Sequence, residues 1–72
     1  MKHLRRRDEL KNMARAYAID VQPELLGGVF VLREWGRIGR AGRVKLDFYA
    51  DPVKALDAAD RLVRAKIRRG YR

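Results

Sequence analysis

The sequence contains no cysteine, no serine and no threonine, and it holds a single histidine, His3. Without cysteine the chain has no disulfide framework and no thiolate metal ligand. One histidine cannot complete a zinc site, which takes about four ligands. The residues that most often act as nucleophiles in covalent catalysis are also missing. These absences predict a protein that is not an enzyme and that uses no metal or cofactor.

Long hydrophobic runs are absent as well. No apolar run approaches the ~18 residues of a membrane span, and residues 1–13 are basic without the apolar stretch of a secretory signal. A chain of 72 residues is limited to one domain, which buries only about 60% of its unfolded surface. We therefore expect a single domain over residues 1–72, located in the cytoplasm and able to associate with the nucleoid.

Positive charge is what the sequence has in excess. Lys and Arg number 18 against 9 Asp and Glu, which gives a net charge of +9, and most of the basic residues are Arg. Arg binds phosphate oxygens with two parallel hydrogen bonds and stacks on flat rings. A small basic domain favours a polyanion because binding releases counterions. Such charge is also found in basic proteins with no nucleic-acid role, since it governs association rather than fold.

Three segments alternate between apolar and other side chains with a period of two, which is typical of strands: residues 13–21, 29–38 and 43–49. The alanines of the first segment leave a short helix as an alternative there. Residues 39–42, GRAG, predict a tight turn, because glycine permits positive φ. Residues 1–12 are either a basic N-terminal arm or a short edge strand near residues 3–6.

Residues 51–70 predict a C-terminal helix. Asp51 is a good N-cap, Pro52 suits the first helical position, and Gly70 ends the helix. Apolar residues recur at helical spacing and form one expected buried stripe: Ala55, Leu56, Ala59, Leu62, Val63 and Ile67. The predicted fold class is α+β, with a small antiparallel sheet of three to four strands and this helix packed on one face.

The alternation assigns two faces to the 29–38 segment. Its even positions, Phe30 and Leu32, indicate a core face beneath the helix, and we expect it to include Val44, Leu46 and Phe48. Trp35 lies on the other face with Arg33 and Arg37, and pairing across the turn adds Arg43 and Lys45. The sequence thus predicts a Trp/Arg surface on the helix-free side of the sheet, with Arg40 beside it.

Such a surface suits nucleic acid, because a Trp ring stacks on a base or sugar while the arginines contact phosphates. The alternative is a Trp that packs on an arginine stem as a surface cation–π pair. Two further basic runs, residues 5–7 and residues 64–72 around Tyr71, either add phosphate contacts or form a solvated tail and a solvated helix end.

The residues Trp35-Gly36-Arg37, followed by Ile38-Gly39 and Gly42-Arg43, resemble the signature of the WGR domain. The resemblance covers most of the chain and is closest to the short stand-alone bacterial form. It implies an antiparallel sheet with a helix on one face. It also implies DNA binding near strand breaks, as in DNA-dependent poly(ADP-ribose) polymerases, with Trp35 on an end sugar or base and Arg37 on the backbone. Position 43 is Arg where many relatives carry Gln.

These observations are interpreted together as a monomeric, non-enzymatic module that binds DNA at ends, nicks or breaks. The candidate binding residues are Trp35, Arg37, Arg33, Arg40, Arg43 and Lys45. A protein-interaction adaptor, with Trp35 as a hot spot for an acidic partner, is the alternative from another class. An RNA-binding module is the third reading.

Overall fold

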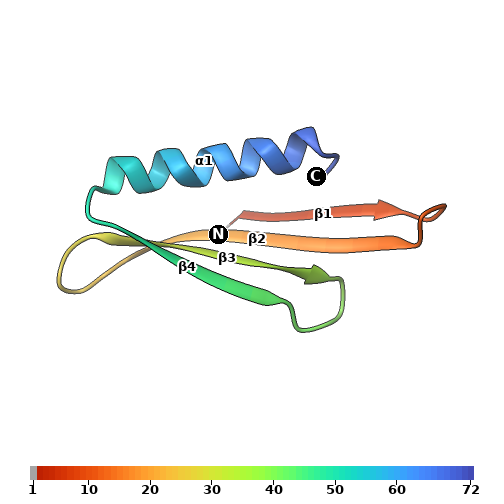
Figure 1. Cartoon of the computed structure of the whole chain (residues 1–72), viewed down its shortest axis with the longest axis horizontal. Coiled ribbons are helices and arrows are strands. Elements are labelled where there is room, and N and C mark those ends of the chain that lie inside the picture. The colour runs from red at the N-terminus through yellow and green to blue at the C-terminus, as the bar shows by residue number, and fades with distance from the viewer. Residues whose placement is uncertain (1) are drawn as a thin grey trace.

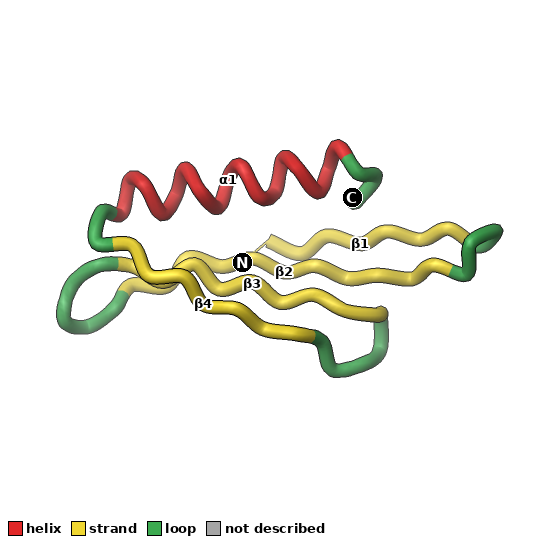
Figure 2. Tube along the Cα trace, viewed as in Figure 1, coloured by secondary structure: helices red, strands yellow, loops and turns green. Residues whose placement is uncertain are grey.

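The computed structural model describes residues 2–72 as four β-strands followed by one α-helix (Figure 1). The elements are β1 (Lys2–Asp8), β2 (Met13–Pro23), β3 (Val29–Arg37), β4 (Arg43–Tyr49) and α1 (Pro52–Arg68). The strands form one antiparallel sheet in the order β1-β2-β3-β4, and α1 lies across one face of it (Figure 2). The predicted α+β class is confirmed, and of the two alternatives for the N-terminal segment the edge strand is observed, over Lys2–Asp8.

The core lies between α1 and the sheet. Its buried side chains come from three strands, the helix and the C-terminal segment: Leu4, Tyr17, Ile19, Val29, Val31, Ala55, Ala59 and Tyr71. Val31, at 1% exposure, is the most completely enclosed of the larger side chains. Trp35 is half-buried and packs against this cluster. The helix presents two alanines to the sheet, which lets its backbone approach closely, while Leu56 and Ile67 of the expected stripe remain half exposed.

The predicted assignment of the two sheet faces is wrong. Helix α1 covers the face that carries Val31 and Trp35, and the opposite face is free of the helix. On that free face Val44, Leu46 and Phe48 are 58%, 54% and 55% exposed. The expected helix-free Trp/Arg surface is therefore on the helix side of the sheet.

Strand register explains this reversal. Tyr17 and Ile19 of β2 lie opposite Trp35 and Arg33 of β3, so β2 adds its large apolar side chains to the Trp35 face. The other face receives only small or polar side chains from the first two strands: His3, Arg5, Arg7, Ala14, Ala16, Ala18, Asp20 and Gln22. Burial is set by the apolar area summed over all four strands, and that sum favours the Trp35 face.

Both ends of α1 follow the local rules that the sequence predicts. The Asp51 carboxylate accepts a hydrogen bond from the Val53 N–H at 2.9 Å. At the other end Gly70 has φ of 98°, its N–H donates to the Ile67 carbonyl, and the Tyr71 N–H donates to the Lys66 carbonyl. This Schellman arrangement turns the chain back, so that Tyr71 enters the core. Within residues 2–72 no helix has the length and apolar composition to cross a bilayer.

Two glycines allow the β3–β4 hairpin to close tightly beside Trp35. A Cβ on Gly36 would lie 2.8 Å from the Gly42 Cα, and a Cβ on Gly42 would overlap the Trp35 carbonyl oxygen. Gly39, in the turn itself, has φ of 84° and open space around it. The glycines of the motif thus serve backbone contact and turn geometry, which holds Trp35 at a defined place on the sheet.

Candidate nucleic-acid interface

Trp35 lies near the end of β3, between Tyr17 of β2 and Arg43 of β4. It lines a hollow of about 510 Å³ that also involves the start of β2 and the C-terminal end of α1. We call this the Trp35 hollow. Its cations are Lys11, Arg15, Arg37 and Lys66, its rings are those of Trp35 and Tyr71, and none of the residues that line it is acidic.

A row of three arginines crosses the sheet next to Trp35. Arg6 of β1 lies opposite Arg15 of β2, which lies opposite Arg37 of β3, so all three share the helix-covered face. None of them forms an ion pair with an acid in the described part of the chain. Like charges directly opposite one another destabilise a sheet. This arginine row is therefore an uncompensated positive site.

Lys66 adds a further cation from the end of the helix. Its Nζ lies 4.7 Å from the centre of the Tyr17 ring and 5.3 Å from the centre of the Tyr71 ring. Burial lowers the pKa of Lys66, and the charges of Arg69, Arg15 and Arg33 lower it further. A bound anion would favour the ammonium form here, because an opposite charge nearby stabilises it.

Tyr17 is buried beside this region, beneath Lys66 and next to Tyr71. Its ring meets the Tyr71 ring edge to face at 6.3 Å. Among residues 2–72, neither the buried Tyr17 hydroxyl nor the buried Arg33 Nε has a hydrogen-bond partner. Burial raises the pKa of the Tyr17 hydroxyl, and the nearby Arg33 guanidinium opposes that rise. The Tyr17 and Tyr71 rings thus form an edge-to-face aromatic pair that contacts the Lys66 ammonium.

The six predicted residues do not all border one hollow, although the register places all of them except Arg40 on the helix-covered face. Trp35 and Arg37 line the Trp35 hollow, and the exposed Arg43 lies beside Trp35 on β4. Arg37 also donates from Nη1 to the Asn12 carbonyl at 3.4 Å, which holds it toward the β1–β2 turn. Arg40 lies in the β3–β4 turn and borders a second hollow of about 200 Å³ with Arg5.

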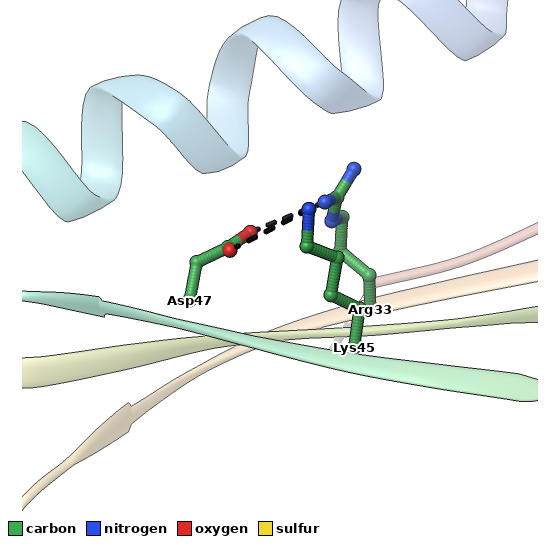
Figure 3. A network of polar contacts seen from close by, with 3 residues as sticks. All are labelled: Arg33, Lys45 and Asp47. Atoms are coloured by element: carbon green, nitrogen blue, oxygen red, sulfur yellow. Dashed lines mark hydrogen bonds and ion pairs between the residues drawn. The ribbon is translucent and has the colours of Figure 1, made fainter.

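Arg33 and Lys45 are held by a single acid beneath the helix. Arg33 Nη2 lies 3.1 Å from Asp47 Oδ2, and Lys45 Nζ lies 3.8 Å from Asp47 Oδ1. All three side chains rise from the sheet toward α1 (Figure 3). The Arg33 side chain is only 21% exposed. Arg33 is therefore less available to a ligand than the exposed Arg37, whereas Lys45 is shared with Asp47 and still 56% exposed.

The sequence places Arg6, Lys66 and Tyr71 in basic runs that either add phosphate contacts or are solvated, and it gives Arg15 no binding role. Lys66 lies four residues after Leu62, so it falls on the apolar stripe of α1. A lysine on this stripe is the sequence signal that could have identified it. Arg15 alternates with Tyr17 on one face of its strand. Only the register across β1, β2 and β3 shows that these residues meet beside Trp35.

Fold and site together define a small basic α+β domain with a half-buried Trp and a cluster of cations at one end of its sheet. The sequence pattern of the WGR domain family matches residues 1–72, and the chain belongs to this family. It is 39% identical over 70 residues to an uncharacterized protein, y4dW, of Sinorhizobium fredii (strain NBRC 101917 / NGR234). That match covers 97% of this chain and 34% of the relative, so the chain spans about a third of its length. No solved structure matches the chain.

Proposed function

We propose that this chain is a non-enzymatic DNA-binding module that contacts duplex ends, nicks or breaks at the Trp35 hollow. The observation that carries the proposal is the arginine row beside Trp35, which forms no ion pair with an acid among residues 2–72. The DNA backbone supplies a closely spaced series of negative charges, and arginine binds phosphate through paired hydrogen bonds. Membership of the WGR family supports the same partner.

Each part of the site has a distinct role in this proposal. Arg15 and Arg37 contact phosphates from the sheet, and Lys66 adds a contact from the end of α1. Trp35 packs against a terminal sugar or base, and stacking of this kind contributes roughly 1–3 kcal/mol. Because Trp35 is held by the core, it is already ordered before DNA arrives, which reduces the entropy lost on binding.

The remaining predicted cations have outer roles. Arg43 and Arg40 extend the positive surface along the β3–β4 hairpin, where passing phosphates add affinity without specificity. Arg33 and Lys45 are shared with Asp47. We propose that they contribute mainly through the field they create and less through direct contacts.

The test compares three DNA forms of equal length by fluorescence anisotropy: an open duplex, a dumbbell with both ends closed by loops, and the same dumbbell with one nick. We expect tighter binding to the open and nicked forms. Equal affinity for the closed dumbbell would refute end and nick recognition. Arg15→Gln should weaken all complexes and reduce the slope of log K against log salt by about 1.

Arg61→Gln provides the matched control, because it makes the same charge change on α1, where Arg61 is bound to Asp57 at 2.9 Å. Equal losses from both variants would show that only net charge matters. Absence of DNA binding at ~50 mM salt would favour the adaptor alternative, because phosphate contacts are strongest at low salt. Competition with RNA of matched length separates the third alternative.

A further inference from the structure

The two edges of the sheet differ in whether their backbone groups are satisfied. At β1, Arg5 exchanges two hydrogen bonds with Arg72, each of 2.8 Å, so the C-terminal residue covers part of that edge. At β4, no further strand pairs with the outer side in the part of the chain that is described. The β4 edge therefore offers a row of backbone donors and acceptors.

The phase of the hydrogen bonds identifies which β4 residues face outward. The Ile38 N–H donates to the Ala14 carbonyl at 2.9 Å. The backbone N–H and C=O groups of even-numbered β3 residues are therefore directed toward β2. In an antiparallel strand the backbone groups of successive residues are directed to alternate edges of the strand. Odd-numbered residues of β3 therefore form their hydrogen bonds with β4. In the observed register, the odd-numbered residues of β4 direct their backbone groups toward β3. The other three residues direct their backbone N–H and C=O groups outward, away from the sheet: Val44, Leu46 and Phe48.

We propose that two copies of this chain associate by antiparallel pairing of their β4 strands about a two-fold axis at Leu46. Each of the three outward-facing residues supplies one donor and one acceptor, so the pairing forms about six hydrogen bonds between the copies. The contact is isologous, because each copy uses the same surface. The result is one continuous sheet with both helices on the same side, since residues opposite one another share a face.

The charges on β4 select this register. With Leu46 opposite its counterpart, Lys45 lies opposite Asp47 of the second copy, at positions where side chains are closest because no hydrogen bonds intervene. A shift of the axis to Lys45 or Asp47 would place like charges opposite each other, which is unfavourable. Charged residues on an edge normally prevent association with unrelated strands. In this strand they are arranged so that a second copy is complementary.

The exposed side chains agree with the same contact. Lys45 lies directly opposite Arg33 within the hairpin and shares Asp47 with it, and its side chain is 56% exposed. The Asp47 of a second copy would provide Lys45 with an acid on the side away from Arg33. On the helix-free face, Val44 would pack beside Phe48 of the other copy, covering apolar surface that is exposed in the single chain.

Dimer formation uses no residue that lines the Trp35 hollow, and it is tested without DNA, because Lys45 of β4 also contributes to the proposed positive field. Sedimentation velocity over protein concentrations up to ~300 μM tests it, since small interfaces are often weak. We expect a concentration-dependent dimer. Leu46→Pro removes an outward N–H and leaves the β3–β4 hydrogen bonds in place, so it should remain a folded monomer by circular dichroism. A monomeric wild type, or a dimer that persists in Leu46→Pro, would overturn the proposal.

Charge reversal tests the register itself. Lys45→Asp and Asp47→Lys should each sediment as monomers, because the introduced residue faces a like charge in the second copy. Mixed together, the two variants should form a one-to-one heterodimer, since every facing pair is then of opposite sign. Thermal melts establish that both are folded, which matters for Asp47→Lys because it loses the Arg33 ion pair. Folded variants that do not pair on mixing would contradict the two-fold axis at Leu46.

Discussion

Trp35 and Tyr17 lie directly opposite each other on β3 and β2, on the face of the sheet that α1 covers. Tyr17 is 3% exposed, whereas Trp35 is half-buried and borders the Trp35 hollow. The Trp of the family signature therefore has two duties in this chain. It is part of the hydrophobic core, and it is the wall of the proposed DNA site.

Trp35→Ala should consequently destabilise the fold as well as weaken DNA binding. Truncation of a buried Trp to Ala lowers the free energy of unfolding by about 3 kcal/mol or more. The loss should be somewhat smaller for Trp35, because it is only half-buried. Urea unfolding monitored by far-UV circular dichroism measures this loss. Trp35→Phe should retain most of the stability and still bind DNA ends less tightly, because its ring offers a smaller stacking surface. Unchanged stability of Trp35→Ala would show that the indole does not contribute to the core.

Gly42→Ala should be far more damaging than Gly39→Ala. The new methyl group at position 42 would overlap the Trp35 carbonyl oxygen, so the hairpin must distort, at a cost of about 3 kcal/mol. At position 39 the space is open, and the cost is only about 1 kcal/mol for a side chain at positive φ. Chemical denaturation of the two variants gives the comparison. Equal effects would mean that the turn, and not the close approach of the two strands, controls stability.

Tyr17→Phe should be as stable as the wild type at neutral pH, or slightly more stable, because the lost hydroxyl is buried and has no hydrogen-bond partner within residues 2–72. At high pH the difference should grow. Burial raises the pKa of Tyr17 in the folded state above its ordinary value of 10.0. Above that value the unfolded chain loses the proton first, so the stability of the wild type falls as pH increases.

Unfolding free energies measured between neutral pH and pH values above 10 check this prediction, with Tyr49→Phe as a control for loss of a hydroxyl elsewhere. Only the difference between wild type and Tyr17→Phe reports on Tyr17. If that difference does not change with pH, the Tyr17 hydroxyl is not protected by burial.

Lys66→Met should separate stability from binding. The pKa of Lys66 is lowered by burial and by neighbouring arginines, so its charged form is disfavoured in the folded state. The wild type is therefore less stable at neutral pH than it would be with a neutral Lys66. Its free energy of unfolding rises as the pH increases from the pKa of Lys66 in the folded state to the ordinary value of 10.5. The methionine variant should therefore be at least as stable at pH 7, and it should lack this rise.

Its affinity for DNA should fall, because one of the cations around the Trp35 hollow is gone. Anisotropy titrations together with thermal melts measure both properties, and Lys54→Met, at an exposed position on α1, is the matched control. A Lys66→Met variant that binds DNA as well as Lys54→Met would remove Lys66 from the site.

The sequence by itself determined β3, β4 and α1, and it left β1 and β2 open between two alternatives each. Asp51 and Pro52 start the helix and Gly70 ends it, and the alternation of residues 43–49 predicts β4 with its observed bounds. Caps, turns and periodicity depend on neighbours within about four residues along the chain. They are therefore readable without any knowledge of the tertiary structure.

Only the tertiary structure decided which face of the sheet is buried. The β3–β4 hairpin alone offers Phe30, Leu32, Val44, Leu46 and Phe48 as a core face, and that reading was wrong. The choice depends on which residues β1 and β2 place beside each face, and a one-residue change in register would invert it. Burial is a sum over side chains that are distant in sequence. For the same physical reason the arginine row beside Trp35 emerges only when three strands are aligned.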